Sequence, residues 1–158
     1  MTERKIVTFS LGERMFGIDM RSLIEIREWE QPTPLPRVPA YVKGVSNLRG
    51  TVIPIIGLAE RLGWEASAIH ARSCILVAVV GSKQAGFLVD EVADIVAIDE
   101  DRIQPAPDVD IAEPGVIAGL VQVATRAPDG SPATEGGAMV SLLDLDQLDV
   151  IRQLDLAA

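Results

Sequence analysis

The chain holds one histidine and one cysteine, so two of the side chains that most often carry catalysis occur once each. His70 lies in Ala-Ser-Ala-Ile-His-Ala-Arg, a stretch typical of a surface linker, and no second histidine could share a metal ion with it. Cys74 opens the apolar run Cys-Ile-Leu-Val-Ala-Val-Val, where a cysteine is more often a small core residue than a nucleophile. A single cysteine also excludes an internal disulfide. These residues predict no catalytic triad and no metal centre.

Other catalytic and cofactor motifs are also missing. The Gly81-Ser82-Lys83 stretch lacks the Gly-Lys-Ser/Thr order of a phosphate loop, and no helical pattern follows it. Carboxylates are abundant between residues 90 and 113, which is typical of a solvated acidic surface rather than of an acid-base pair. We therefore predict a binding module without a cofactor. A small acidic hydrolase that uses His70 is the catalytic alternative.

Charge and hydropathy restrict the partners. The 158 residues carry a net charge of −9, with +2 on residues 1–72 and −11 on residues 73–158. An acidic chain lacks the basic footprint that nucleic-acid binding needs, although its acidic half could steer basic partners. The apolar runs are all shorter than the roughly 20 residues that span a bilayer, and the N-terminus has no signal-type apolar region. We expect a soluble, cytosolic protein that does not insert into membranes.

One cation stands out by its position. Residues 43–56 read Lys-Gly-Val-Ser-Asn-Leu-Arg-Gly-Thr-Val-Ile-Pro-Ile-Ile, so two β-rich runs flank Arg49-Gly50. Glycine tolerates the positive φ of a tight turn, and the segment therefore predicts a hairpin that displays Arg49 at its tip. The guanidinium group suits a carboxylate or a polar partner surface. Pro54 predicts that the second strand is an edge strand or is bulged.

The remaining elements of the first half must hold this hairpin. Alternation predicts strands over 6–11 and 15–18, and Asp19 could cap a short helix over 20–24. The mixed segment 25–30 is expected to be a strand with Leu23, Ile26 and Trp29 toward the core and Glu25, Arg27 and Glu28 outward. Four prolines within residues 32–39 predict a stiff connector anchored by Leu35 and Val38. A short helix over 57–63 and a linker over 64–72 follow.

The second half repeats the pattern weakly, with a hairpin, an apolar-Asp step and a mixed segment. Strands are predicted over 74–80, 85–89, 116–123 and 139–143, with a mixed segment over 90–98. Residues 99–113 form an acidic loop with Ile103 tucked in, residues 125–137 a hairpin loop, and residues 144–155 a C-terminal helix. Many short strands with few helices favour small β-barrels or sandwiches over a doubly wound sheet.

Together these segments resemble the CheW family of chemotaxis coupling proteins, from about Ile6 to Leu154. The matching residues are Phe16-Gly17-Ile18-Asp19, Ile24-Glu25-Ile26-Arg27, Val42-Lys43-Gly44-Val45-Ser46-Asn47-Leu48-Arg49-Gly50, Ile53-Pro54-Ile55-Ile56, Gly86-Phe87-Leu88-Val89-Asp90-Glu91-Val92, Ile103-Gln104-Pro105-Ala106-Pro107 and Ile117-Ala118-Gly119-Leu120. The Lys-Gly…Asn-Leu-Arg-Gly…Pro element is the most specific part.

The resemblance implies a mainly β, CheW-like fold of two five-stranded SH3-like β-barrel lobes on a shared core. We expect one domain over 1–158, with approximate lobes at 15–70 and at 71–143 plus the N-terminal strand, and the C-terminal helix over 144–155. It also implies a non-catalytic scaffold that couples the cytoplasmic tip of chemoreceptors to the regulatory domain of the histidine kinase CheA, in the cytoplasm at membrane-associated arrays. The alternative is a CheW-like adaptor of a non-chemotaxis signalling array.

The resemblance also implies a receptor site in a groove between the lobes. By matching positions, its residues are Leu23, Glu25, Gly44, Arg49, Val92 and Ile95, whereas the kinase contacts are not assigned. Apolar anchors with polar groups that set the register suit a helix in a groove. Two departures from the family are Gly57, where an acidic or amide residue is common, and the long loop over 125–137, which could tune partner choice.

Overall fold

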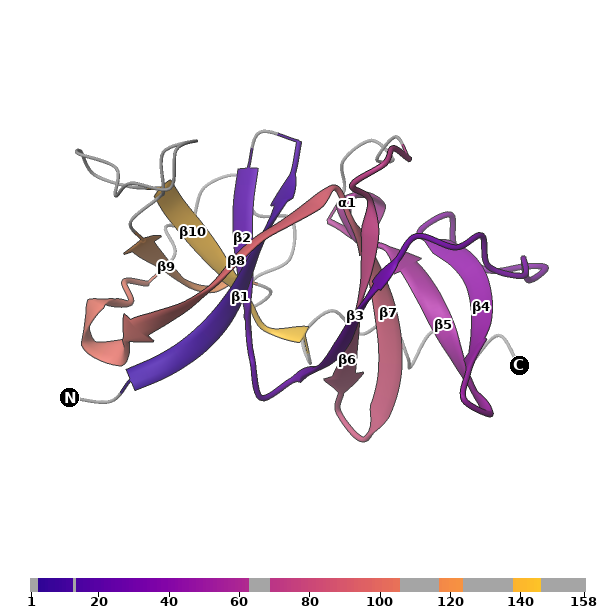
Figure 1. The fold of residues 1–158 in the computed structure, drawn as a ribbon, viewed down its shortest axis with the longest axis horizontal. Coiled ribbons are helices and arrows are strands. Elements are labelled where there is room, and N and C mark those ends of the chain that lie inside the picture. The colour runs from indigo at the N-terminus through magenta and orange to yellow at the C-terminus, as the bar shows by residue number, and fades with distance from the viewer. Residues whose placement is uncertain (1–2, 13, 63–68, 106–116, 124–137, 146–158) are drawn as a thin grey trace.

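In the part of the chain that the structure describes, the fold consists of ten strands, one four-residue helix and one 3₁₀ turn (Figure 1). The computed structural model describes residues 3–12, 14–62, 69–105, 117–123 and 138–145. The elements are β1 (Glu3–Leu11), β2 (Arg14–Asp19), β3 (Leu23–Glu28), β4 (Val42–Leu48), β5 (Thr51–Gly57), α1 (Leu58–Arg61), β6 (Cys74–Val80), β7 (Lys83–Val89), β8 (Glu91–Asp99), η1 (Glu100–Arg102), β9 (Ile117–Val123) and β10 (Ala138–Leu143). The mainly β prediction is confirmed.

The strands form two five-stranded sheets. Sheet A has the order β8-β1-β2-β10-β9, and sheet B has the order β3-β6-β7-β5-β4. Neighbouring strands are antiparallel except for β2 with β10 and β5 with β7, which are parallel. The two sheets have the same strand order if β6 to β10 are matched in turn with β1 to β5. In each sheet the strands then run in the order third, first, second, fifth, fourth.

Each half of the chain exchanges strands with the other half. The hairpin β1–β2 lies in sheet A, but β3 leaves it to pair with β6 in sheet B. Likewise, the hairpin β6–β7 lies in sheet B, and β8 leaves it to pair with β1 in sheet A. The predicted second lobe, residues 71–143 plus the N-terminal strand, agrees with sheet A in that β1 pairs with β8. The sheets differ from the predicted ranges because β2 also lies in sheet A and β6–β7 lie in sheet B, since the chain crosses over after Asp19 and again after Asp90.

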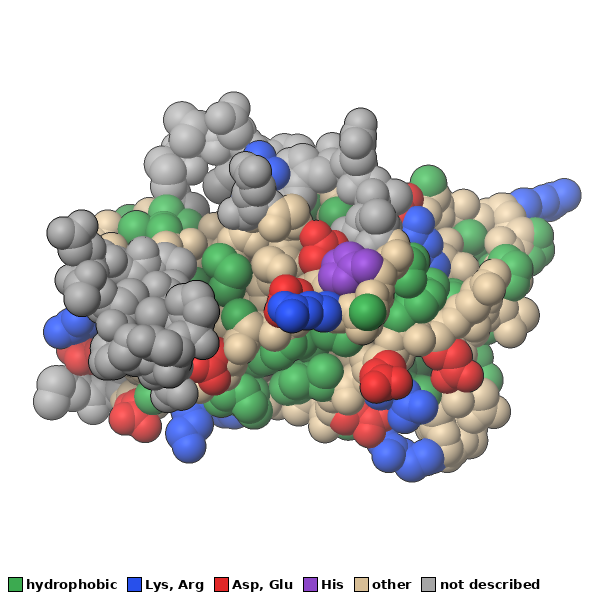
Figure 2. Space-filling model, turned by 45° about the horizontal axis from the view of Figure 1, so that its top comes forward, with side chains coloured by type: hydrophobic (Ala, Val, Ile, Leu, Met, Phe, Trp, Pro, Cys, Tyr) green, Lys and Arg blue, Asp and Glu red, His purple; other side chains and the backbone are tan. Residues whose placement is uncertain are grey.

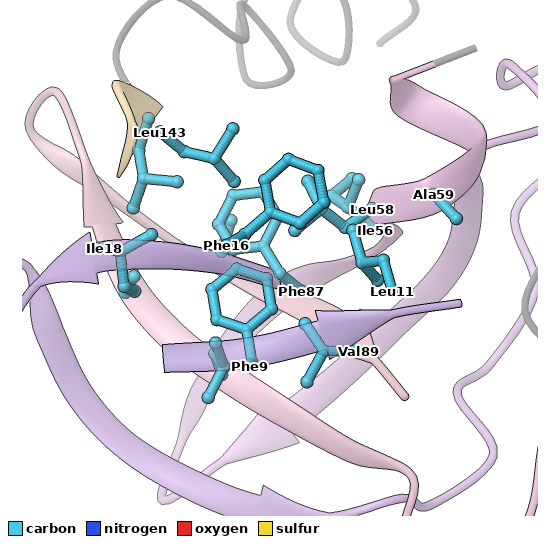
Figure 3. Packing of buried hydrophobic residues seen from close by; sticks show 14 of the residues in the cluster. Phe9, Leu11, Phe16, Ile18, Ile56, Leu58, Ala59, Phe87, Val89 and Leu143 are labelled. Carbon is cyan, nitrogen blue, oxygen red and sulfur yellow. The ribbon is translucent and has the colours of Figure 1, made fainter. Parts of the chain in front are cut away.

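Three apolar clusters hold the sheets. The shared core contains residues of both sheets, including Phe9 and Phe16 from sheet A and Phe87 from sheet B (Figure 3). Each sheet also has its own core, around Val140 in sheet A and around Ile55 in sheet B. The rings of Phe9 and Phe16, which are paired across the β1–β2 hairpin, stack with their centroids 6.1 Å apart and so stabilise this hairpin within the shared core.

The side-chain alternation of β6 explains its continuous apolar sequence. Leu76 and Ala78 point into the shared core, whereas Ile75 and Val77 point into the core of sheet B. Successive side chains of a strand point to opposite faces, so a strand buried on both faces must be apolar throughout. Cys74 is buried in the shared core as predicted, and burial raises the pKa of its thiol, which disfavours the nucleophilic thiolate.

Single bridges join the outer strands of each sheet. Thr33, which follows β3, exchanges two backbone hydrogen bonds of 2.9 and 2.8 Å with Val45 of β4. Gln104, which follows η1, exchanges two of 2.8 Å with Leu120 of β9. Within the described residues each sheet is thus curled so that its outer strands approach, without a continuous ladder between them.

Several local predictions need correction. Residues 20–22 form a turn rather than a helix, because the Asp19 carboxylate accepts the backbone N–H of Arg21 at 2.8 Å and the chain enters β3 at Leu23. Pro54 marks neither an edge strand nor a bulge, since β5 lies between β7 and β4 and the register shift of the β4–β5 ladder falls between Val42 and Gly44. It is tolerated because the parallel ladder with β7 begins only at Ile55.

Two side chains expected in the core are exposed. Leu35 is exposed, whereas Val38 packs against the shared core as predicted. Ile26 is also exposed, while Glu25 and Arg27 are half-buried. The predicted C-terminal helix beyond Leu145, the loop over 125–137 and most of the linker over 64–72 lie outside the described residues.

Candidate functional site

The hairpin between β4 and β5 displays Arg49 as predicted. Arg49 and Gly50 have φ values of 52° and 90°, the pattern of a two-residue type I′ turn between the paired residues Leu48 and Thr51. The side chain of Asn47 accepts the backbone N–H of Gly50 at 2.8 Å. An arginine in this left-handed conformation costs about 1 kcal/mol or more relative to a relaxed backbone. The Asn-Leu-Arg-Gly sequence therefore holds a strained arginine at an exposed tip.

Glu25 links Arg49 to the opposite edge of sheet B. The Arg49 guanidinium donates to Glu25 Oε2 at 2.7 Å, and Arg27 donates to Glu25 Oε1 at 3.2 Å. The hydrogen bond from Arg49, together with that from Arg27, holds the pKa of the Glu25 carboxyl below its usual value. The Arg49 side chain is 70% exposed and that of Glu25 is 22% exposed. The guanidinium is thus oriented by its partner and remains accessible to another molecule.

The outer strands β3 and β8 present apolar side chains beside the shared core. Ile26 lies opposite Leu76, and Ile95 lies opposite Val7. Opposed residues of an antiparallel pair share a face, and both Leu76 and Val7 belong to the shared core. Ile26 and Ile95 therefore lie on the faces that the sheets turn toward each other, but they are 43% and 50% exposed.

The same irregularity occurs at the start of both strands. β3 has one extra residue, Ile24, between the partners of Ala78 and Val77, and β8 has one extra residue, Ala93, between the partners of Phe9 and Thr8. Such a β-bulge re-aims the side chains next to it. The registers make three pairs of residues equivalent: Leu23 with Val92, Glu25 with Asp94, and Ile26 with Ile95.

We call the apolar residues of these two strand starts the apolar seam: Leu23, Ile24, Ile26, Val92 and Ile95. Leu23 and Val92 pack against the shared core, and the other three are exposed. Apolar side chains gather near the middle of one face of the molecule, with acidic and basic side chains on either side (Figure 2). Exposed apolar residues in such an arrangement are typical of a partner-binding surface.

Gly44 has a structural role at this end of sheet B. Its φ is 144°, and a Cβ atom built on it would overlap the carbonyl oxygen of Thr33. Only glycine therefore lets the chain after β3 approach β4 closely enough to form the Thr33–Val45 bridge. Gly44 is buried, so it keeps the chain after β3 close to β4 instead of contacting a partner directly.

The candidates for catalysis are not assembled into a site. His70 is exposed, and its Nδ1 accepts the backbone N–H of Arg72 at 3.1 Å. Within the described residues, no three or more His, Cys, Asp and Glu side chains are grouped so that they could hold a metal ion. In the same part of the chain, no helix has the length and apolar character needed to cross a membrane.

Comparison with known proteins identifies the family to which this chain belongs. A family model described as the CheW-like domain matches residues 5–151. The chain belongs to the CheW-like family.

Named relatives and a solved structure agree with this assignment. Chemotaxis protein CheW of Rhizobium meliloti (strain 1021) is 43% identical over 106 residues, which are 67% of this chain and 68% of that protein. Chemotaxis protein CheW of Klebsiella aerogenes is 30% identical over 145 residues, covering 92% and 81%. The crystal structure of the scaffolding protein TtCheW from Thermoanaerobacter tengcongensis superimposes with a TM-score of 0.77 at 29% identity, covering 93% of this chain and 92% of that one.

The structure places the predicted residues as follows. Glu25 and Arg49 form one ion pair, Leu23 and Val92 pack against the same shared core, and Ile95 is exposed on β8. Gly44 is the one predicted residue that is buried.

Sequence reasoning missed Ile24 and Ile26, which are exposed in the seam. The weak repeat between the two halves of the sequence could have identified Ile26, because Ile26 occupies the position in β3 that the predicted site residue Ile95 occupies in β8.

Proposed function

We propose that this chain is a non-catalytic scaffold that couples chemoreceptors to the histidine kinase CheA in chemotaxis signalling. The observation that carries the proposal is the match to the CheW-like domain over residues 5–151, together with the names of the relatives, which include a scaffolding protein. The proposal also places the protein in the cytoplasm, at receptor arrays. It treats residues 1–158 as one CheW-like domain in which each sheet is an SH3-like barrel.

The apolar seam is the proposed receptor surface. A receptor tip is a helical coiled coil, and an amphipathic helix buries an apolar stripe against a surface of this kind. Ile26 and Ile95, which are equivalent positions of the two sheets, would be the main anchors, since they are exposed apolar residues on the facing strands. Leu23 and Val92 would support them from the shared core.

Arg49 and Glu25 would set the register of the bound helix. Arg49 is already oriented by Glu25, so it loses little side-chain freedom when a receptor carboxylate or carbonyl approaches. Gly44 would contribute indirectly, by keeping the chain after β3 against β4.

Charge reversal separates a partner contact from a purely internal ion pair. We expect Arg49→Glu to keep the fold and to weaken binding to a receptor cytoplasmic fragment about tenfold or more, because one charge is reversed and Glu25, which keeps only Arg27 as a partner, then faces a like charge. Glu25→Arg combined with Arg49→Glu restores an internal pair of opposite charges. The matched control is Arg21→Glu, which reverses an exposed arginine that pairs with Asp19 in the turn before β3.

The outcomes of this experiment are distinct. Weak receptor binding by both Arg49→Glu and the double variant, with normal binding of the CheA regulatory domain, supports Arg49 as a direct contact. Recovery in the double variant would indicate that only the internal pair matters. Wild-type affinity of Arg49→Glu would refute the receptor surface. Failure of the wild-type chain to bind either cognate partner would refute the chemotaxis role itself.

A further inference from the structure

The two strands that carry the apolar seam differ in how one carboxylate is paired. Their registers make Glu25 of β3 equivalent to Asp94 of β8. Glu25 is neutralised within the molecule, because its carboxylate accepts hydrogen bonds from Arg49 at 2.7 Å and from Arg27 at 3.2 Å. Asp94 makes no ion pair with the described residues, and among them its carboxylate accepts only the backbone N–H of Ile95, at 2.8 Å. One position of a repeated pattern is therefore neutralised in sheet B and charged in sheet A.

The residues around Asp94 explain why it lacks the partners of Glu25. The position of Arg27, two residues after the carboxylate, is occupied by Val96 in β8, and valine cannot pair with an acid. The second arginine of Glu25 comes from the tip of the β4–β5 hairpin, whereas the equivalent tip, between β9 and β10, lies outside the described residues. Asp94 is exposed, so its charge is presented to solvent.

A buried hydroxyl group fixes the backbone that carries Asp94. Thr8 lies opposite Asp94 at the bulge and is only 2% exposed. Its hydroxyl group donates to the backbone oxygen of Asp94 and accepts the backbone N–H of Asp94, both at 3.1 Å. A buried polar group is normally kept where its hydrogen bonds are satisfied, as they are here, and the equivalent residue of sheet B is the apolar Val77. The exposed carboxylate thus stands on a fixed backbone, which loses little freedom on binding.

The proposed receptor surface is consequently polar in its charge. On the side of sheet B, two arginines and one carboxylate leave one net positive charge, and the Arg49 side chain that carries it is 70% exposed. On the side of sheet A, Asp94 leaves one negative charge directly before the exposed Ile95. The whole sequence has the same asymmetry, with +2 on residues 1–72 and −11 on residues 73–158. A helix that contacts both strands would meet a cation from one sheet and a carboxylate from the other.

We propose that Asp94 is a specificity-determining residue that accepts a lysine or arginine side chain of the receptor helix and thereby sets the direction of that helix. This inference rests on the proposed function. In this arrangement Arg49 binds an acidic group of the helix and Asp94 binds a basic one. A helix bound in the opposite direction would bring its basic group to Arg49 and its acidic group to Asp94, and both contacts would be repulsive. Glu25, at the equivalent position, orients Arg49 instead of contacting a receptor cation.

The test changes the charge of Asp94 and searches for its partner on the receptor. Asp94→Asn removes the charge and keeps an oxygen that can accept the N–H of Ile95, and Asp94→Lys reverses the charge. Asp101→Lys is the matched control, because Asp101 is an exposed carboxylate in η1, beyond the far end of β8. Each purified full-length chain is titrated calorimetrically with a cytoplasmic fragment of the cognate chemoreceptor, at low and at physiological salt, and its melting temperature is measured. Wild type and Asp94→Lys are also titrated with a panel of receptor fragments, each with one lysine or arginine of the tip changed to glutamate.

We expect Asp94→Asn to bind the receptor fragment about fivefold more weakly and with a smaller salt dependence than wild type, and Asp94→Lys to bind about tenfold more weakly or worse. Their melting temperatures should match that of wild type, and Asp101→Lys should leave receptor binding unchanged. One receptor fragment of the panel should bind Asp94→Lys more tightly than it binds wild type.

Three results would overturn this inference alone. They are receptor binding of both Asp94 variants within about twofold of wild type, an equal loss in Asp101→Lys, and a panel in which no fragment regains affinity for Asp94→Lys. A wild-type chain that does not bind the unchanged receptor fragment would refute the proposed function as well.

Discussion

Gly44→Ala tests whether Gly44 acts by holding the fold rather than by touching a partner. A Cβ at this position overlaps the carbonyl oxygen of Thr33 and meets Pro34 N at 3.1 Å, so the chain after β3 must move. The substitution also places an alanine at a φ of 144°, which costs about 1–3 kcal/mol. Moving the chain breaks the two hydrogen bonds between Thr33 and Val45, worth about 0.5–1.5 kcal/mol each.

These contributions add to a destabilisation of about 2–6 kcal/mol, with a central value near 4 kcal/mol. For a domain of this size each kcal/mol lowers the melting temperature by about 2–4 °C, so Gly44→Ala should lower it by roughly 8–16 °C. The assay is thermal unfolding followed by circular dichroism, combined with urea unfolding at 25 °C to obtain the free energy.

Gly50→Ala is the matched control for this experiment. Gly50 also has a positive φ, of 90°, but a Cβ built on it meets nothing within 4 Å. The control therefore carries the backbone strain without the overlap, and Gly44→Ala should be less stable than Gly50→Ala by the two lost hydrogen bonds, about 1–3 kcal/mol. Equal losses in the two variants would show that the overlap and the bridge contribute nothing, and the structural account of Gly44 would be wrong.

Two further predictions concern the proposed receptor surface. Ile26→Asp and Ile95→Asp should each weaken receptor binding about tenfold with little loss of stability, because both side chains are already exposed. Met139→Asp, which changes an exposed apolar residue of β10, should leave receptor binding unchanged. Calorimetric titration measures the three affinities, and equal losses at all three sites would contradict the assignment of the apolar seam. The pKa of Glu25 is lowered in the folded chain by Arg49, so its stabilising contribution is present above the unfolded pKa and is lost as pH falls through the folded pKa. The stability difference between wild type and Arg49→Ala should therefore shrink between pH 6 and about pH 3 in urea unfolding, and a difference that grows on acidification would refute the role of this pair.

Local patterns predicted the strands of this fold well, because alternation and turn residues act within a few residues. Cys74–Val80 has the bounds that its apolar run predicted, and the Arg49-Gly50 turn follows from glycine chemistry alone. The pairing of strands was not accessible in this way. The crossings of β3 and β8 depend on contacts between distant residues, and nothing within the turns at Asp19 and Asp90 specifies which sheet receives the next strand.

The orientation of Ile26 illustrates a second limit. Alternation placed it toward the core, and its register opposite Leu76 does put it on the face of the shared core. Its exposure arises because β3 is the outermost strand of its sheet, where the covering layer ends. A sequence can indicate which face a residue joins, but the extent of the layer above that face is set by the packing of the whole molecule.

The exchange of strands explains how the proposed receptor surface is held in place. The apolar seam needs both sheets, because Ile26 comes from β3 of sheet B and Ile95 from β8 of sheet A. Each of these strands is hydrogen-bonded to a strand from the opposite half of the chain, β3 to β6 and β8 to β1, and the shared core packs between the two sheets. Neither half can therefore rotate without breaking a strand ladder. The proposed receptor surface is thus carried by strands of both sheets, which are held by strand ladders and one shared core instead of by a flexible linker.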